Sequence, residues 1–201
     1  HEGVSYTVTS LRWGFFSSER KNVTGLILPD TLETADVSFG KFPNVTELTI
    51  PGSVKIFDGD MQWMEKLETL TFAEGVEEIA SGSMLNNCSA LTTLNLPDSL
   101  SRITGTSTFS GATALRSVVL PADLEVTEGG LFSDCTSLES IELPSSMNAV
   151  PYGMFDGCTA LTEVKTTASI TEIGSSAFAG CSSLKSVPAL GQVTKIGERA
   201  F

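Results

Sequence analysis

Residues 161–184 read LTEVKTTASITEIGSSAFAGCSSL, and most of the features of this stretch recur along the chain. It opens with two apolar residues three positions apart, Leu161 and Val164, continues to a second apolar pair, Ile170 and Ile173, and ends with FAGC. A unit of this size is too small to bury its own apolar side chains. It therefore predicts a structure in which similar units stack on one another.

The same pattern recurs along most of the chain. Equivalent segments begin at Val23, Val45, Leu67, Leu91, Leu115, Leu138, Leu161 and Leu184. Consecutive starts are separated by 22, 22, 24, 24, 23, 23 and 23 residues, a period typical of leucine-rich repeats. We therefore predict a leucine-rich-repeat right-handed solenoid, mainly β with little helix, in which about eight coils fill residues 23–201 and the last is incomplete.

Each unit predicts two strands and a turn. Apolar residues at positions 1, 4 and 6, commonly followed by proline, predict the strand of a main parallel sheet, as in LTTLNLP from Leu91, LRSVVLP from Leu115 and LESIELP from Leu138. A second apolar pair further on, such as Val76 and Ile79, predicts a second sheet of short strands. The end of each unit predicts one short helical or 3-10 turn.

Residues that recur at one position of the repeat are expected to form columns inside the stack. An internal ladder is expected from the phenylalanines at matching positions: Phe109, Phe132, Phe155, Phe178 and Phe201. A second column is expected from Ala112, Cys135, Cys158 and Cys181. Stacked cysteines lie close enough for a disulfide, but parallel side chains in a buried setting favour free thiols.

The segment that ends in AFAGCSSL at Leu184 resembles the repeat of the BspA-like leucine-rich-repeat family, L-x-x-I-x-I-P, then V-x-x-I-G, then A-F-x-G-C-x-x-L. The resemblance covers residues 23–201 and is strongest from Leu67 onward. It implies a secreted or surface-anchored bacterial protein that adheres to a host or neighbouring-cell protein or glycan.

The two ends of the chain depart from the repeat. Residues 1–22 lack it and carry the apolar residues Tyr6, Val8, Leu11, Trp13, Phe15 and Phe16, with Tyr6 and Val8 alternating as in a strand. We predict an N-terminal cap that shields the first coil; a membrane or ligand contact is the alternative. Because the chain begins at His1 and ends in mid-repeat, we expect an export signal already removed and further repeats or another domain beyond Phe201.

Charge and composition disfavour several classes of partner. The formal net charge of -12 disfavours nucleic acid and anionic membrane surfaces. No run approaches the ~18 apolar residues of a membrane span, so we expect no membrane insertion by this fragment.

The chain offers little for catalysis. Its single histidine is His1, and its cysteines recur one repeat apart, which is unlike a zinc or redox motif. Asp58 and Asp60 suggest calcium only weakly, because the alternating ligands of a calcium loop are missing and a polar turn explains them. We expect a non-enzymatic protein with no catalytic residue, metal or cofactor.

Positions 3 and 5 of the main strand should face solvent, and they form the candidate binding face. Its residues are Glu47, Thr49, Thr69, Thr71, Thr93, Asn95, Ser117, Val119, Ser140, Glu142, Glu163 and Lys165. Half of them are small hydroxyl side chains, and none is aromatic. A plain solvated β-surface is the alternative interpretation.

One coil carries a candidate anchor outside this face. Residues 56–66 read IFDGDMQWMEK, with Met61 at the phenylalanine position and Met64 at the cysteine position, and this predicts a local irregularity. Trp63 stands where other coils have the turn residues Asn87, Gly111, Asp134, Gly157 and Gly180. An exposed tryptophan there would be a partner anchor. Large aromatic residues are usually mostly buried, which favours the alternative that the irregular coil turns Trp63 inward.

These observations favour an extracellular, non-enzymatic binding or adhesion module that recognises a protein or glycan through the exposed sheet face. The alternative is a structural spacer that displays another domain on the bacterial cell surface.

Overall fold

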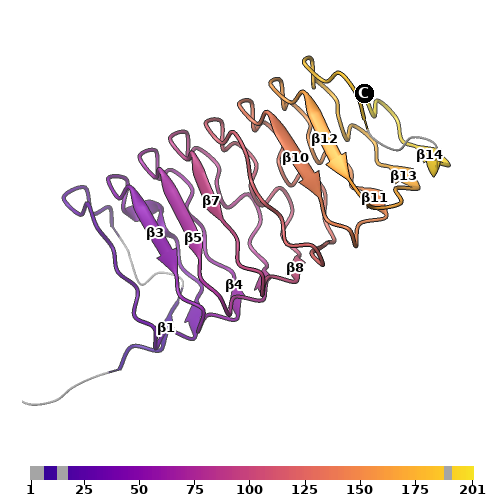
Figure 1. Cartoon of the computed structure of the whole chain (residues 1–201). Helices are drawn as coiled ribbons and strands as arrows, with labels where there is room; N and C mark the ends of the chain where they lie inside the picture. Colours follow the sequence, from indigo (N-terminus) through magenta and orange to yellow (C-terminus); the bar gives the residue numbers. More distant parts are fainter. Residues whose placement is uncertain (1–6, 13–17, 188–191) are drawn as a thin grey trace, which may run out of the picture.

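The computed structural model describes residues 7–12, 18–187 and 192–201. The chain winds into a parallel β-solenoid of about 8 turns with almost no helix. In Figure 1 the longer strands lie side by side along one side of an elongated stack, and the shorter strands lie along another. The solenoid predicted from the repeat is confirmed.

The main sheet contains the longer strands. They are β3 (Glu47–Ile50), β5 (Thr69–Phe72), β7 (Thr93–Asn95), β10 (Ser140–Leu143) and β12 (Glu163–Thr166). The first three pair in the order β3-β5-β7, and the last two pair with each other, all in parallel. Leu48, Leu70 and Leu94 are in register, so one sequence repeat is one coil of the stack.

The second sheet contains two-residue strands. One group is β4 (Ile56–Phe57), β6 (Glu78–Ile79), β8 (Arg102–Ile103) and β9 (Glu125–Val126), and the other is β11 (Ala149–Val150), β13 (Glu172–Ile173) and β14 (Lys195–Ile196). A separate pair joins β1 (Ser10–Leu11) to β2 (Thr34–Ala35). The second strand predicted around Val76 and Ile79 is confirmed, because Ile79 lies in β6, which pairs with β8.

The third side of each coil consists of turns. On this side lies the 3-10 helix η1 (Phe39–Lys41). The later coils have i to i+3 hydrogen bonds there, for example from the N–H of Cys158 to the carbonyl of Phe155 at 3.0 Å. Other bonds run along the solenoid axis, as from the N–H of Phe132 to the carbonyl of Met154 at 2.9 Å. The third side therefore forms a hydrogen-bonded row of its own.

Phenylalanine rings form a ladder inside the later coils. The ring centroids of Phe109, Phe132, Phe155, Phe178 and Phe201 follow one another at 5.6, 6.0, 5.4 and 5.5 Å. The last three pairs are stacked, and the first is tilted. The predicted internal ladder is confirmed.

The predicted main strand LRSVVLP from Leu115 is wrong. Residues 115–137, the central coil, keep the alternation of buried Val118 and exposed Ser117, yet residues 116–120 form no strand. In the described part of the chain no backbone hydrogen bond joins them to residues 92–97. Alternation determines which side chains face inward, but it does not set the distance between neighbouring coils.

The second sheet is interrupted after the central coil, because β9 in the central coil pairs with β8 before it and not with β11 after it. Only the third side continues through the central coil. There the N–H groups of Phe109 and Phe132 donate to the carbonyls of Leu131 and Met154, at 3.0 and 2.9 Å. Both sheets are therefore divided at the central coil while the third side is continuous.

Replacing Gly105 by alanine should destabilise the fold, because neighbouring coils touch at this corner. A Cβ atom at Gly105 would lie 2.1 Å from the carbonyl oxygen of Ser81 and 2.4 Å from its carbon, both rigid backbone atoms. We expect Gly105→Ala to lower the free energy of unfolding by about 1–3 kcal/mol, measured by urea denaturation. Gly25→Ala is the matched control, since nothing lies within 4 Å of its Cβ position. Equal stability of the two variants would contradict the close approach.

The N-terminal segment is described only in part. Leu11 is buried and lies in β1, whereas Val8 is exposed and lies outside any strand. Tyr6, Trp13, Phe15 and Phe16 lie outside the described residues. That residues 1–22 cap the first coil stays a prediction.

Candidate binding surface

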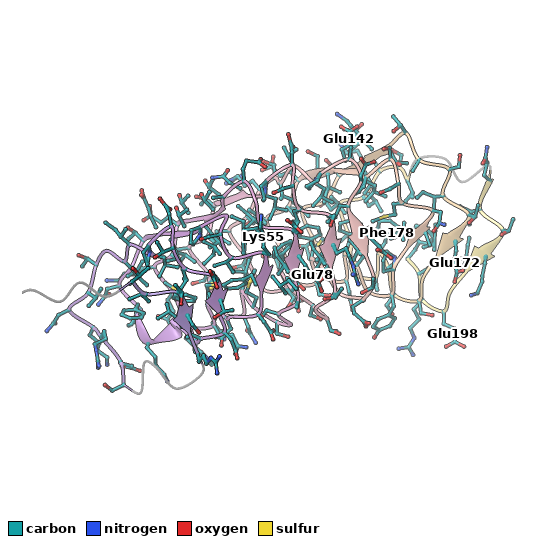
Figure 2. The ribbon with its side chains drawn as sticks, turned by 90° about the horizontal axis from the view of Figure 1, so that it is seen from below. Lys55, Glu78, Glu142, Glu172, Phe178 and Glu198 are labelled. Atoms are coloured by element: carbon teal, nitrogen blue, oxygen red, sulfur yellow. The ribbon has the colours of Figure 1, made fainter. Side chains whose placement is uncertain are left out.

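The outward positions of the main sheet form one continuous surface, here called the main-sheet face. All twelve residues predicted to face outward are exposed or half-buried, from Glu47 to Lys165. The residues that alternate with them, such as Leu70 and Ile141, are buried. Figure 2 shows Glu142 projecting away from the ribbon. The predicted orientation is confirmed, and whether this face binds a partner stays a prediction.

Parallel pairing brings the outward residues into rows that run from coil to coil. Glu47, Thr69 and Thr93 form one row. Thr49, Thr71 and Asn95 form the next, in which the amide of Asn95 donates to the hydroxyl of Thr71 at 3.0 Å. Beyond the central coil, Ser140 pairs with Glu163 and Glu142 pairs with Lys165. The face thus changes from mainly hydroxyl rows to rows that carry both charges.

The central coil hollows the main-sheet face on both of its sides. A depression of about 280 Å³ lies between residues 92–96 and 117–119, and one of about 310 Å³ lies between residues 118–122 and 142–145. Val119 borders both and is 84% exposed. These hollows lie where the strand pairing of the main sheet is interrupted, so the sequence pattern did not predict them.

An aliphatic side chain at one end of this face was missed by sequence reasoning. Ile27 is 95% exposed and borders a depression of about 380 Å³ that Glu47 and Thr49 also line. It occupies the same repeat position as Thr49. The residues predicted to face outward began with Glu47, in the coil that begins at Val45. The alternation in the preceding coil, which begins at Val23, was the signal that could have found Ile27.

Trp63 lies at a corner of the solenoid, between the third side and the main sheet. It is 58% exposed, so the alternative that it folds inward is wrong. Its φ of 70° is in the left-handed region, as are the φ angles of Asn87, Gly111 and Asp134 at the same position of later coils. Glycine, asparagine and aspartate tolerate this conformation, whereas other residues lose roughly 1–2 kcal/mol in it.

The coil around Trp63 is more regular than predicted. The N–H groups of Met61 and Trp63 donate to the carbonyls of Met84 and Asn86, both at 3.0 Å, in the pattern of the later coils. Met61 and Met64 are fully buried. The predicted local irregularity is therefore wrong, because the flexible methionine side chains fill the positions of phenylalanine and cysteine without disturbing the backbone.

Asp60 in the same coil has a structural role. Its Oδ1 accepts hydrogen bonds from the hydroxyl of Ser38 at 3.1 Å and from the N–H of Gln62 at 3.2 Å. Burial is the main cause that raises the pKa of this carboxyl above its usual value. Asp60 thus joins two coils at a polar turn, which is the interpretation favoured over calcium.

The cysteine column contains three buried thiols, Cys88, Cys135 and Cys158, and the half-buried thiol of Cys181. Cys88, Cys135, Cys158 and Cys181 are free, and each Sγ donates to a main-chain carbonyl of the preceding coil at 3.1–3.3 Å. Burial raises the pKa of Cys88 and of Cys135 to about 12. The same cause raises the pKa of Cys158 further and that of Cys181 to about 11. The free-thiol interpretation is the one the structure supports.

Two further kinds of feature are absent from the described residues. These residues contain no helix long and apolar enough to cross a membrane. In the same parts of the chain, no three or more His, Cys, Asp or Glu side chains gather as they would around a metal ion.

Comparison with known families agrees with this architecture. The sequence profile of the BspA type leucine rich repeat region matches residues 4–111 and 82–201, in 6 copies. The chain belongs to this family. BspA-type leucine-rich repeat proteins are bacterial cell-surface proteins.

Solved structures similar to this BspA-type chain are bacterial leucine-rich repeat proteins. One from T. pallidum is 28% identical, with a TM-score of 0.69 over 79% of this chain and 76% of its own. One from Eubacterium ventriosum is 20% identical, with a TM-score of 0.63 over 86% and 52%. A leucine-rich cell surface protein from Faecalibacterium prausnitzii is 22% identical, with a TM-score of 0.55 over 95% and 57%. No curated protein matches the BspA-type chain in sequence.

Proposed function

We propose that this chain is an extracellular, non-enzymatic binding module that holds a protein or glycan of a host or neighbouring cell on its main-sheet face. The observation that carries the proposal is the pair of hollows around Val119 within a face of uncovered polar rows. A concave place with an exposed aliphatic side chain and several polar neighbours is where a partner gains most by binding.

The charge of the chain narrows the class of partner. With a net charge of -12, the protein repels polyanions such as nucleic acids over most of its surface. The main-sheet face nevertheless carries Lys165 beside Glu142 and Glu163, so its charge is mixed at that end. A partner of low or mixed charge suits such a face better than a polyanion.

The state of the titratable groups supports a non-enzymatic role. Catalysis at neutral pH usually uses an activated nucleophile or a tuned acid and base. The thiols of Cys88 and Cys135 have pKa values of about 12, so they are protonated and poorly nucleophilic at neutral pH. His1 is the single histidine of the sequence. A binding module has no need of such groups.

Substitutions on the main-sheet face test the proposal. The protein is screened against immobilised matrix proteins, mucins and a neutral and acidic glycan panel, and we expect at least one partner to bind. Thr93→Arg and Val119→Arg each place a long cation beside a hollow and should weaken that partner by about tenfold or more. Thr127→Arg, an exposed residue that follows β9, is the control and should leave the affinity unchanged. Silence of the whole panel, or equal effects of all three variants, would contradict the proposal.

A structural spacer is the second candidate function. It is favoured by the third side, whose hydrogen bonds run along the axis through coil after coil. A spacer predicts that Thr93→Arg and Val119→Arg leave every activity of the full-length protein unchanged at the cell surface. Deletion of whole coils, in contrast, should reduce its activity by shortening the distance to the cell wall.

A further inference from the structure

Trp63 occupies a position where its side chain contributes little to the fold. Met61 and Met64 on either side of it are fully buried, whereas more than half of the Trp63 side chain is exposed. Its backbone makes the same bond along the axis as other residues of the third side, from its N–H to the carbonyl of Asn86. A residue suited to the left-handed conformation, such as the asparagine at position 87, would make that bond with less strain. A bulky aromatic held in this conformation is therefore explained better by an external partner than by the core.

The surface next to Trp63 is low and polar. Asn87 stands one coil further on at the same repeat position, and its amide donates to Asn86 Oδ1 at 3.0 Å. The next residue of the row is Gly111, which has no side chain and whose Cβ position would lie 3.8 Å from Asn86 Oδ1. Among the described residues, the amide nitrogen of Asn86 donates to no partner. Asn86, whose carbonyl accepts the bond from the Trp63 N–H, thus lies in the coil next to Trp63 and has an amide nitrogen free to bind a ligand.

We infer that Trp63, Asn86 and Asn87 form a site for a neutral saccharide at this corner, separate from the main-sheet face. A sugar ring has a C–H face that packs on an aromatic ring and a rim of hydroxyls that pair with amides. This combination fits one exposed indole beside two asparagines. A protein interface would instead need an apolar patch around its aromatic anchor. Met64 beside Trp63 is buried, and the neighbours that reach the surface, Gln62 and Asn86, are polar. The net charge of -12 disfavours anionic glycans.

The inference extends the proposed binding function, and the two can fail separately. Loss of binding at the corner would leave the main-sheet face and its variants untouched. Failure of the main-sheet face to bind any partner would not affect a saccharide that stacks on Trp63.

Titration with defined oligosaccharides tests the site. The probes are maltotriose and triacetylchitotriose as neutral sugars and 3′-sialyllactose as the anionic one, each up to about 10 mM, with calorimetry as the readout. Tryptophan fluorescence in a Trp13→Phe background gives a second readout that reports on Trp63 alone. We expect saturable binding of at least one neutral sugar and weaker binding of the anionic one.

Trp63→Asn is the informative variant, because asparagine is the residue at the same position of the next coil. We expect it to reduce saccharide affinity at least tenfold while its melting temperature stays equal or rises by about 2–4 °C, because the left-handed strain is relieved. Thr127→Arg, an exposed residue that follows β9 and lies outside the main-sheet face, is the control and should bind the sugar as the wild type does. Absence of neutral sugar binding, unchanged binding by Trp63→Asn, preference for the anionic sugar, or a lower melting temperature of Trp63→Asn would each overturn the inference.

Discussion

Replacing Phe155 by alanine is expected to lower the free energy of unfolding by about 3–5 kcal/mol. The Phe155 ring is fully buried and stacks on Phe132 at 6.0 Å and on Phe178 at 5.4 Å. Its removal would leave a cavity between two neighbours whose own positions are set by hydrogen bonds along the axis, so the core cannot close around it. The midpoint of guanidinium denaturation, followed by circular dichroism, measures the change.

Phe155→Leu separates the loss of the ring from the loss of volume. Leu85 is fully buried two coils before Phe132 at the same repeat position, so leucine is compatible with this column. We expect Phe155→Leu to cost about 1 kcal/mol, well below the alanine variant. If both variants had equal stability, packing of the ladder would not be what holds these coils together.

Stability should also fall steeply in mild alkali. Burial raises the pKa of the Cys88 and Cys135 thiols from an ordinary 9.0 to about 12, and raises that of Cys158 as well. Below pH 9 the thiols stay protonated in both the folded and the unfolded state, so the free energy of unfolding does not depend on their titration. Between about pH 9 and 12 only the unfolded state loses the thiol protons, and the stability falls by about 1.4 kcal/mol per thiol and pH unit, or about 4 kcal/mol for the three at pH 10.

The measurement is a series of urea denaturation midpoints between pH 8 and 11. The triple variant Cys88→Ala, Cys135→Ala and Cys158→Ala is the control, because Ala112 is fully buried at the same position of another coil. It should be less stable than the wild type at pH 8 and should have a much flatter alkaline slope. Parallel curves for the two proteins would show that other groups cause the alkaline loss.

The repeat allowed most of the fold to be predicted from sequence. Periodic recurrence determines which residues share a column, so the phenylalanine ladder, the cysteine column and the outward positions followed directly from alignment. The central coil did not follow. Its residues Val118 and Ser117 obey the alternation, but pairing also depends on the distance between neighbouring coils, which the pattern does not encode.

The candidate binding surfaces were predictable only in part. Alignment placed Trp63 at a turn position, and burial statistics for tryptophan then favoured the wrong, inward orientation. The deciding quantity was the left-handed φ shared with Asn87, which orients the side chain out of the core whatever its apolar character. The hollows beside Val119 depend on the interrupted strand pairing of the main sheet, so the residue types alone would not have located them.

The divided sheets determine how the molecule should respond to mechanical load. Along most of its length, the hydrogen bonds of the main sheet, the second sheet and the third side share any force that bends the stack. At the central coil the two sheet rows are interrupted in turn, and only the third side, with bonds such as that from Phe109 to Leu131, continues without a break. The solenoid is therefore easiest to bend at the central coil, and the coils on either side of it are stiffer. Under traction a cell-surface protein of this design would flex first at the place where its main-sheet face is hollowed.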